Sequence, residues 1–214
     1  MDTKLLDRYR SEAGAAAYRG KYRRSWTRRI SSRRELSLVR RALLGIEGGR
    51  PKAVLDCPCG AGRLLPLLLE GAERVAAADI SAAMVREARR ARGGGVVFVQ
   101  ASAGGLPFAT GAFDVVVCHR LIHHVVSRKE RAPILAELAR VSRRAVVLSF
   151  ADAGTRRARR KRGRTKCATL SAAELAAEAA EQGLRLTSPV RRLGGWVSFL
   201  AVAVLLAERP AGGA

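Results

Sequence analysis

Short apolar runs alternate along the chain with stretches in which apolar residues recur every three or four positions. The runs, each typical of a buried strand, are AVLDC (53–57), RVAAADI (74–80), VVFVQAS (96–102), FDVVVCHR (113–120) and RAVVLSFA (144–151). The helical stretches lie at 63–72, 81–95, 121–143 (a loop, then a helix) and 170–184. Because strands that alternate with helices form parallel sheets, this order predicts a doubly wound α/β domain.

The last part of the chain departs from this alternation. Residues 184–193 and 196–208 both have strand character, and no helical stretch separates them. We therefore expect an antiparallel hairpin at one edge of a mostly parallel sheet of about seven strands.

Residues 1–50 are expected to form a separate helical segment, ahead of a main domain at 51–214. Ser32 and Glu35 have the spacing of a capping box, which predicts a helix start there, and Gly48 and Gly49 would end that helix. Its apolar face would consist of Ile30, Leu36, Val39, Leu43 and Leu44. The aromatic residues among the arginines suit either stacking on bases or packing against the core, which we favour; they are Tyr18, Tyr22 and Trp26.

Composition fits one folded domain but adds a charge anomaly. The chain has 214 residues, 48% of them hydrophobic, and a net charge of +22. Residues 1–41 contribute +9, and residues 156–166, in a basic loop expected at 154–168 after the fifth strand, contribute +8. Such segments attract phosphate in nucleic acid or in lipid head groups, or they are simply a solvated surface.

The four cysteines do not form a disulfide framework, and no apolar stretch is long enough to cross a bilayer. No secretory signal opens the printed sequence. We expect a reduced, cytoplasmic protein. Cys57 and Cys59 fit a turn that tolerates small residues better than a metal or redox pair, and Trp196 and Phe199 fit a core strand.

The first strand ends in DCPCGAGR, a glycine turn with Gly60 and Gly62. Ligands of open parallel sheets bind at the carboxyl ends of strands, where such turns let the backbone approach closely. The second strand ends in Asp79, seventeen residues after Gly62, and an acid there can accept both hydroxyls of a ribose. Together these features predict a nucleoside cofactor.

The dinucleotide pattern Gly-x-Gly-x-x-Gly fails here, whether it starts at Pro58 or at Gly60. Asp56 would also repel a pyrophosphate, whereas a cofactor with an ammonium and a sulfonium group would be attracted to it. Charge therefore favours S-adenosylmethionine.

Four segments resemble, in order, the motifs of class I S-adenosylmethionine-dependent methyltransferases: VLDCPCGAGRLLPLL, VAAADISAAMVREAR, LPFATGAFDVVVCHRLIHHV and VVLSF. The likeness spans about residues 50–150, is greatest to ubiquinone/menaquinone-type enzymes, and implies a Rossmann-like fold. It also implies that the amino-terminal segment is a lid over the cofactor. The implied cofactor contacts are Asp56, Gly60, Gly62, Asp79, Ile80, Met84, Ser102, Ala103 and Cys118.

The sequence departs from the family pattern at two positions. Pro58 stands where the family usually has its first glycine, and Ser102 stands where it usually has an aspartate. The loss of that charged contact to adenine weakens cofactor binding by about 1 kcal/mol.

All three histidines fall within six residues, at 119, 123 and 124. No carboxylate is nearby and adjacent histidines are expected to point apart, so we predict no metal site. His119 and His124 are candidate general bases on the acceptor side, and packing or helix capping is the alternative for each.

The sequence leaves three functions open. The first is methyl transfer to a small or lipid-linked anionic metabolite. The second is methylation of RNA through the basic segments, although no Asn/Asp-Pro-Pro-Tyr/Phe motif follows the fourth strand. The third is a non-catalytic S-adenosylmethionine-binding interaction protein, which the intact cofactor motifs disfavour.

Overall fold

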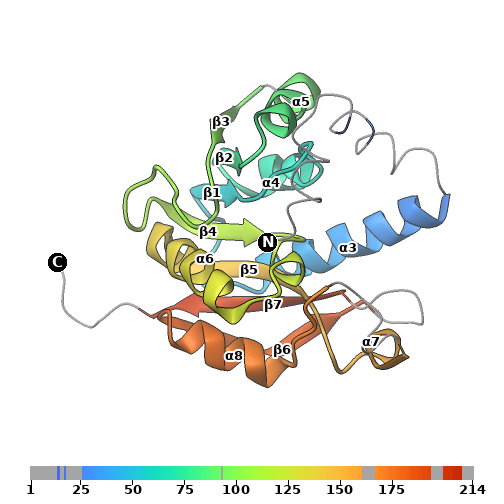
Figure 1. The fold of residues 1–214 in the computed structure, drawn as a ribbon. Helices are drawn as coiled ribbons and strands as arrows, with labels where there is room; N and C mark the ends of the chain where they lie inside the picture. Colours follow the sequence, from blue (N-terminus) through green and yellow to red (C-terminus); the bar gives the residue numbers. More distant parts are fainter. Residues whose placement is uncertain are drawn as a thin grey trace.

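A computed structural model describes residues 14, 17, 26–92, 94–160, 167–193 and 200–208. In this part of the chain, seven strands form one sheet in the order β3-β2-β1-β4-β5-β7-β6 (Figure 1). The strands are β1 Ala53–Asp56, β2 Arg74–Asp79, β3 Val96–Gln100, β4 Phe113–Cys118, β5 Ser142–Ala151, β6 Leu184–Arg192 and β7 Leu200–Ala207. The helices are α3 Trp26–Leu44, α4 Leu65–Gly71, α5 Ala82–Arg92, η1 Ile122–His124, α6 Arg128–Val141, α7 Arg156–Arg160 and α8 Ala172–Ala180.

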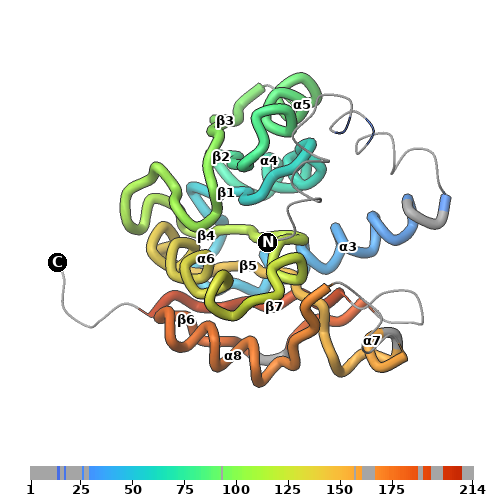
Figure 2. Tube along the Cα trace, viewed as in Figure 1, coloured from blue at the N-terminus to red at the C-terminus, as the bar shows by residue number. Residues whose placement is uncertain are grey.

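The first five strands are parallel, and β7 pairs antiparallel with both β5 and β6. This confirms the predicted doubly wound sheet with an antiparallel hairpin at one edge. The trace in Figure 2 shows the last strand of the chain entering between β5 and β6. The strands from β1 to β3 follow one another toward one edge of the sheet, and β4 starts again on the other side of β1. The carboxyl ends of the neighbours β1 and β4 therefore form the switch point, where ligands of such sheets bind.

Successive side chains of a strand point to opposite sides of the sheet, and most of these strands are largely apolar. Both faces of the sheet are therefore apolar, and helices cover both. Val115 and Val117 of β4 pack in the core cluster that also contains residues of α3, α4 and α5. Val116 and Cys118 pack in the other cluster, with residues of α6 and α8. A buried ion pair between Arg131 of α6 and Glu178 of α8 joins the helices on that second face.

The amino-terminal helix differs from the prediction. It runs from Trp26, so Ser32 and Glu35 lie in its interior and the predicted capping box is wrong. Trp26 is 74% exposed, which contradicts the expected packing against the core, and Leu44 is also on the surface. Tyr18 and Tyr22 lie outside the described residues.

The basic segment after β5 also differs from the expected loop, since residues 156–160 form the short helix α7. The rest of its basic residues, at 161–166, lie outside the described part of the chain, as do Trp196 and Phe199. No helix among the described residues is long and apolar enough to cross a membrane.

Candidate functional site

The turn after β1 is held tightly against its neighbours at the switch point. Gly60 and Gly62 have φ angles of 52° and 74°, in the left-handed region that favours glycine. A Cβ on Gly62 would lie 3.0 Å from Cδ1 of Leu65 and 3.2 Å from Cβ of Ala88, so the turn packs directly against α5. Both predicted glycines therefore have conformations that other residues adopt only with strain.

Asp79, at the end of β2, fixes this turn from the neighbouring strand. Its Oδ2 accepts a hydrogen bond from the backbone N–H of Gly60 (2.8 Å), and its Oδ1 accepts one from Ser81 (2.9 Å). The Asp79 side chain is buried, with 7% of the residue exposed. Burial raises its pKa, and the two N–H donors oppose that shift. A carboxylate oxygen can accept two hydrogen bonds, so each oxygen of Asp79 keeps acceptor capacity for a hydroxyl of a ligand.

Asp56, at the end of β1, is fully buried, and neither carboxylate oxygen has a hydrogen-bond partner among the described residues. Burial raises its pKa well above the ordinary value; the charge of Arg63 opposes this shift and that of Asp79 adds to it. A buried carboxyl group without partners costs free energy, so it points to a missing partner. A bound cationic or hydrogen-bonding group would remove that cost.

The other predicted cofactor residues lie at the end of β4 and on the segments after β2 and β3. Ile80 is 38% exposed, whereas Met84 is buried in a small cluster with Ala61 and Ala83. Ser102 and Ala103 follow β3, and Ser102 Oγ accepts a hydrogen bond from the N–H of Gly104 (3.3 Å). Cys118 lies at the expected strand end, but its side chain is fully buried in the core.

The histidines lie after β4. His119 is 6% exposed, and its Nε2 is 3.3 Å from Oε2 of Glu35. Burial lowers the pKa of His119 to about 4 even though Glu35 opposes that shift. The ring is therefore neutral at pH 7, and the contact is a hydrogen bond rather than an ion pair. His123 and His124 do not point apart as expected, since their ring centroids are 4.1 Å apart.

Glu35 of α3 is the functional candidate that sequence reasoning missed. It is 1% exposed and accepts hydrogen bonds from Arg63 (3.1 Å), from Arg120 (2.9 and 3.2 Å) and from His119. Burial alone would raise its pKa, but the hydrogen bond from His119 and the charges of Arg120 and Arg63 hold it at about 2. Ser32 accepts a further hydrogen bond from Arg63 (2.9 Å).

These contacts fasten α3 to the carboxyl ends of the sheet. Arg63 belongs to the glycine turn, while His119 and Arg120 follow β4. Arg120 has a φ of 62°, unusual for a residue other than glycine, and its N–H donates to Ser149 Oγ (2.7 Å). One sequence signal could have indicated Glu35, because it is the single acid among the six arginines of α3.

Neither a reactive cysteine nor a metal ion is indicated at these strand ends. Burial raises the pKa values of the Cys57, Cys59 and Cys118 thiols, which therefore stay protonated at neutral pH. Among the residues that the structure describes, no group of three or more His, Cys, Asp or Glu side chains could hold a metal ion.

The sequence is similar to those of known methyltransferases over the segment that forms this site. The methyltransferase domain family matches residues 54–145, from β1 into β5. Magnesium protoporphyrin IX methyltransferase of Arabidopsis thaliana is 39% identical over 102 residues, which is 46% of this chain and 32% of the relative. Demethylmenaquinone methyltransferase of Beutenbergia cavernae is 37% identical over 117 residues, which is 53% of this chain and 47% of the relative. Malonyl-[acyl-carrier protein] O-methyltransferase of Legionella pneumophila is 38% identical over 78 residues, which is 34% of this chain and 27% of the relative. Each of these matches spans less than half of the curated relative.

Solved structures share the fold over almost the whole chain. Magnesium protoporphyrin IX methyltransferase of Synechocystis PCC 6803, with bound SAH, has a TM-score of 0.78 at 20% identity and covers 97% of this chain and 100% of its own. N-methyltransferase NodS of Bradyrhizobium japonicum, also with SAH, has a TM-score of 0.67 at 13% identity over 83% of this chain and 87% of its own.

Proposed function

We propose that the chain transfers a methyl group from S-adenosylmethionine to a small or lipid-linked anionic acceptor, because residues 54–145 match the methyltransferase domain family and the fold is that of solved methyltransferases. The observation that carries the proposal is the pair of buried carboxyl groups at adjacent strand ends. Within the described part of the chain, neither oxygen of Asp56 has a hydrogen-bond partner. Asp79 keeps acceptor capacity and holds the glycine turn that follows Asp56.

The residues present fit this cofactor. Asp79 has the position and the acceptors for the two ribose hydroxyls, and a cationic methionine end would favour ionisation of the buried Asp56 carboxyl. Gly60 and Gly62 let the backbone come close to the ligand. The remaining predicted contacts, Ile80, Met84, Ser102, Ala103 and Cys118, belong to the same proposal. The sulfonium supplies an already activated methyl group, so the protein has to align donor and acceptor and exclude water.

His119 is the better candidate for the base of the two that the sequence offers, the other being His124. The pKa of Glu35 is about 2, so it is a carboxylate at pH 7 and its contact requires the proton of His119 on Nε2. The lone pair then lies on Nδ1, which is buried and has no hydrogen-bond partner among the described residues. A base held in one tautomer by a carboxylate is a common arrangement for accepting a substrate proton.

The helix that carries Glu35 fits a lid role for residues 1–50, ahead of a domain at 51–214. Its attachment to the site runs through charged hydrogen bonds rather than through apolar packing alone. Movement of α3 would therefore change the surroundings of Arg63, His119 and Arg120 together.

The nature of the acceptor is proposed from the matched relatives. Their names point to a magnesium porphyrin, a demethylmenaquinone and a malonyl group on acyl-carrier protein, all small or carrier-linked molecules. RNA remains the second candidate only because of the net charge of +22. A cytoplasmic location, expected from the cysteines, is part of this proposal.

The experiment is methyl transfer from a labelled donor to a panel of anionic metabolites and carrier-linked acids. We expect incorporation into at least one acceptor. His119→Ala should lower turnover by about 10²–10⁴ and leave the affinity for S-adenosylhomocysteine unchanged. His124→Ala is the matched control, and a larger loss there would transfer the role to His124. No transfer to any acceptor, together with no binding of S-adenosylhomocysteine, contradicts the proposal.

A further inference from the structure

Helix α3 has two sharply different faces. The side that packs on the sheet carries Glu35, Leu38, Val39 and Ala42, all buried. The opposite side carries exposed arginines with a large apolar residue near each end of the helix. Trp26 is 74% exposed and Leu44 is 79% exposed. These two residues are eighteen positions apart, which is five turns at 3.6 residues per turn, so they lie on the same line along the helix.

The arginines between them form what we call the α3 basic face. Its members lie on the exposed side of the helix between the two apolar residues, and they are Arg29, Arg33, Arg34, Arg40 and Arg41. Arg40 pairs with Glu70, with both side chains more than half exposed, and the other four make no salt bridge with the described part of the chain. Like charges four positions apart, as at Arg29 and Arg33, destabilise a helix. An external anion would relieve that repulsion.

An apolar cavity of about 440 Å³ adjoins the carboxyl-terminal end of this face. Leu43 and Leu44 line it together with Val54 and Leu68. Its charged lining residues are Arg40, Arg50 and Glu70, and Glu70 pairs with Arg40, so the lining keeps a net positive charge. The cavity lies at the amino end of β1, away from the glycine turn at the other end of the strand, so it does not belong to the proposed cofactor site. Its lining suits an apolar chain whose anionic head lies among arginines.

We propose that the α3 basic face docks on an anionic phospholipid surface, with the arginines on the phosphates and with Trp26 and Leu44 in the interface. Basic helices with Trp and Leu on the contacting side bind membranes in this way. The exposed Leu44 and the apolar cavity beside it argue for lipid over nucleic acid, because a phosphate backbone alone would leave both without a partner. Figure 1 shows that the amino-terminal end of α3 projects beyond the sheet, which leaves the face accessible along the helix.

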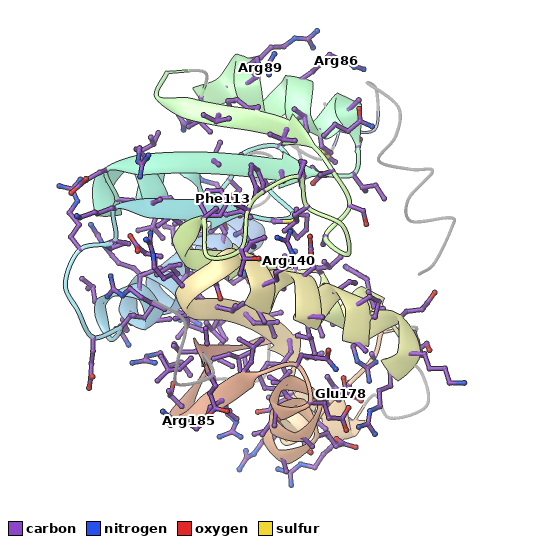
Figure 3. All side chains as sticks on the ribbon, turned by 90° about the vertical axis from the view of Figure 1, so that its left-hand side faces the viewer. Arg86, Arg89, Phe113, Arg140, Glu178 and Arg185 are labelled. Atoms are coloured by element: carbon purple, nitrogen blue, oxygen red, sulfur yellow. The ribbon has the colours of Figure 1, made fainter. Side chains whose placement is uncertain are left out.

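The test is co-sedimentation of the whole chain with vesicles of phosphatidylcholine alone and with vesicles that also contain the anionic phospholipid phosphatidylglycerol. We expect binding only to the anionic vesicles. The α3 variant replaces Arg29, Arg33, Arg34 and Arg41 with Gln, and should lower the partition coefficient on the order of 10²–10³-fold. The matched control replaces Arg86, Arg89, Arg90 and Arg92 of α5 with Gln. It removes the same charge from a different surface, where Figure 3 shows Arg86 and Arg89 pointing outward, and it should keep most of the binding.

A second pair of variants tests the apolar contribution at constant charge. Leu44→Ser should weaken vesicle binding several-fold, while Val97→Ser, at an exposed site on β3, should not. Binding of S-adenosylhomocysteine confirms that each variant is folded, and the vesicle assay needs no methyl transfer, so it can fail independently of the proposed function. Absence of binding to anionic vesicles overturns the proposal. Equal losses in the α3 and α5 variants overturn it too, since net charge alone would then explain binding. Binding to single-stranded RNA that depends on α3, without binding to vesicles, also overturns it.

Discussion

Glu35→Gln should destabilise the protein by about 3 kcal/mol at pH 7. Two independent routes give this figure. A carboxyl pKa that falls from 4.5 to about 2 on folding corresponds to about 3 kcal/mol. Loss of one partner from a buried ion pair costs roughly 3–5 kcal/mol, and the lower end applies because the Arg120 side chain is one third exposed.

The sign of the pH dependence follows from the lowered pKa. Glu35 stabilises the folded protein above pH 4.5, and this contribution disappears as the pH falls from 4.5 to about 2. Denaturant unfolding of the wild type and of Glu35→Gln at a series of pH values measures it. The two free energies of unfolding should differ by about 3 kcal/mol at pH 7 and should converge near pH 2.

Glu70→Gln is the matched control, because Glu70 also pairs with an arginine of α3 but both of these side chains are exposed. We expect it to cost less than about 1 kcal/mol. If Glu35→Gln cost no more than Glu70→Gln, or if its cost did not change with pH, the account of Glu35 as a buried ion-pair centre would be wrong.

Three further outcomes follow from the site. Asp56→Asn should stabilise the unliganded protein at pH 7, because an amide does not ionise in the unfolded state as this aspartate does. The gain should grow as the pH rises above 3.8, because the raised pKa means that only the unfolded state then loses its proton readily, and thermal melts without ligand measure it. Asp79→Ala should weaken binding of S-adenosylhomocysteine by about 1.5–3 kcal/mol in calorimetry, and an unchanged affinity in a folded variant refutes the ribose assignment. Neutralising the basic residues at 156–162 should leave turnover on a metabolite within a few-fold, whereas loss of salt-sensitive RNA binding together with loss of RNA methylation would favour RNA as the acceptor.

The sheet could be predicted because its strands follow simple patterns. Runs such as 113–118 and 144–151 are apolar at nearly every position, as expected of strands covered on both faces. The edge hairpin could be predicted because no helical stretch separates the last two strands.

Helix ends were less predictable, and one spacing shows why. Ser171 and Glu174 form a capping box at the start of α8, whereas Ser32 and Glu35, with the same spacing, lie inside α3. The side chains of Ser32 and Glu35 instead accept hydrogen bonds from Arg63. Such a partner, about thirty residues away in sequence, leaves no local signal.

The site was predictable where motifs are contiguous and not where distant segments meet. The glycine turn and Asp79 follow the order of strands, so their meeting at the switch point could be expected. Glu35 reaches His119 and Arg120 across 84 and 85 positions, and only the packing of α3 brings them together. For Asp79 the sequence indicated a role toward a ligand, but not the hydrogen bond by which this side chain also holds the backbone of the turn.

The central claim, that the carboxyl ends of β1 and β2 bind S-adenosylmethionine, is tested most directly by calorimetric titration with S-adenosylhomocysteine and, separately, with NAD. The account predicts saturable binding of S-adenosylhomocysteine and no heat from NAD, because the amino group of S-adenosylhomocysteine supplies the buried Asp56 carboxyl with a partner, whereas a pyrophosphate would oppose its ionisation. Binding of NAD with no response to S-adenosylhomocysteine would contradict it.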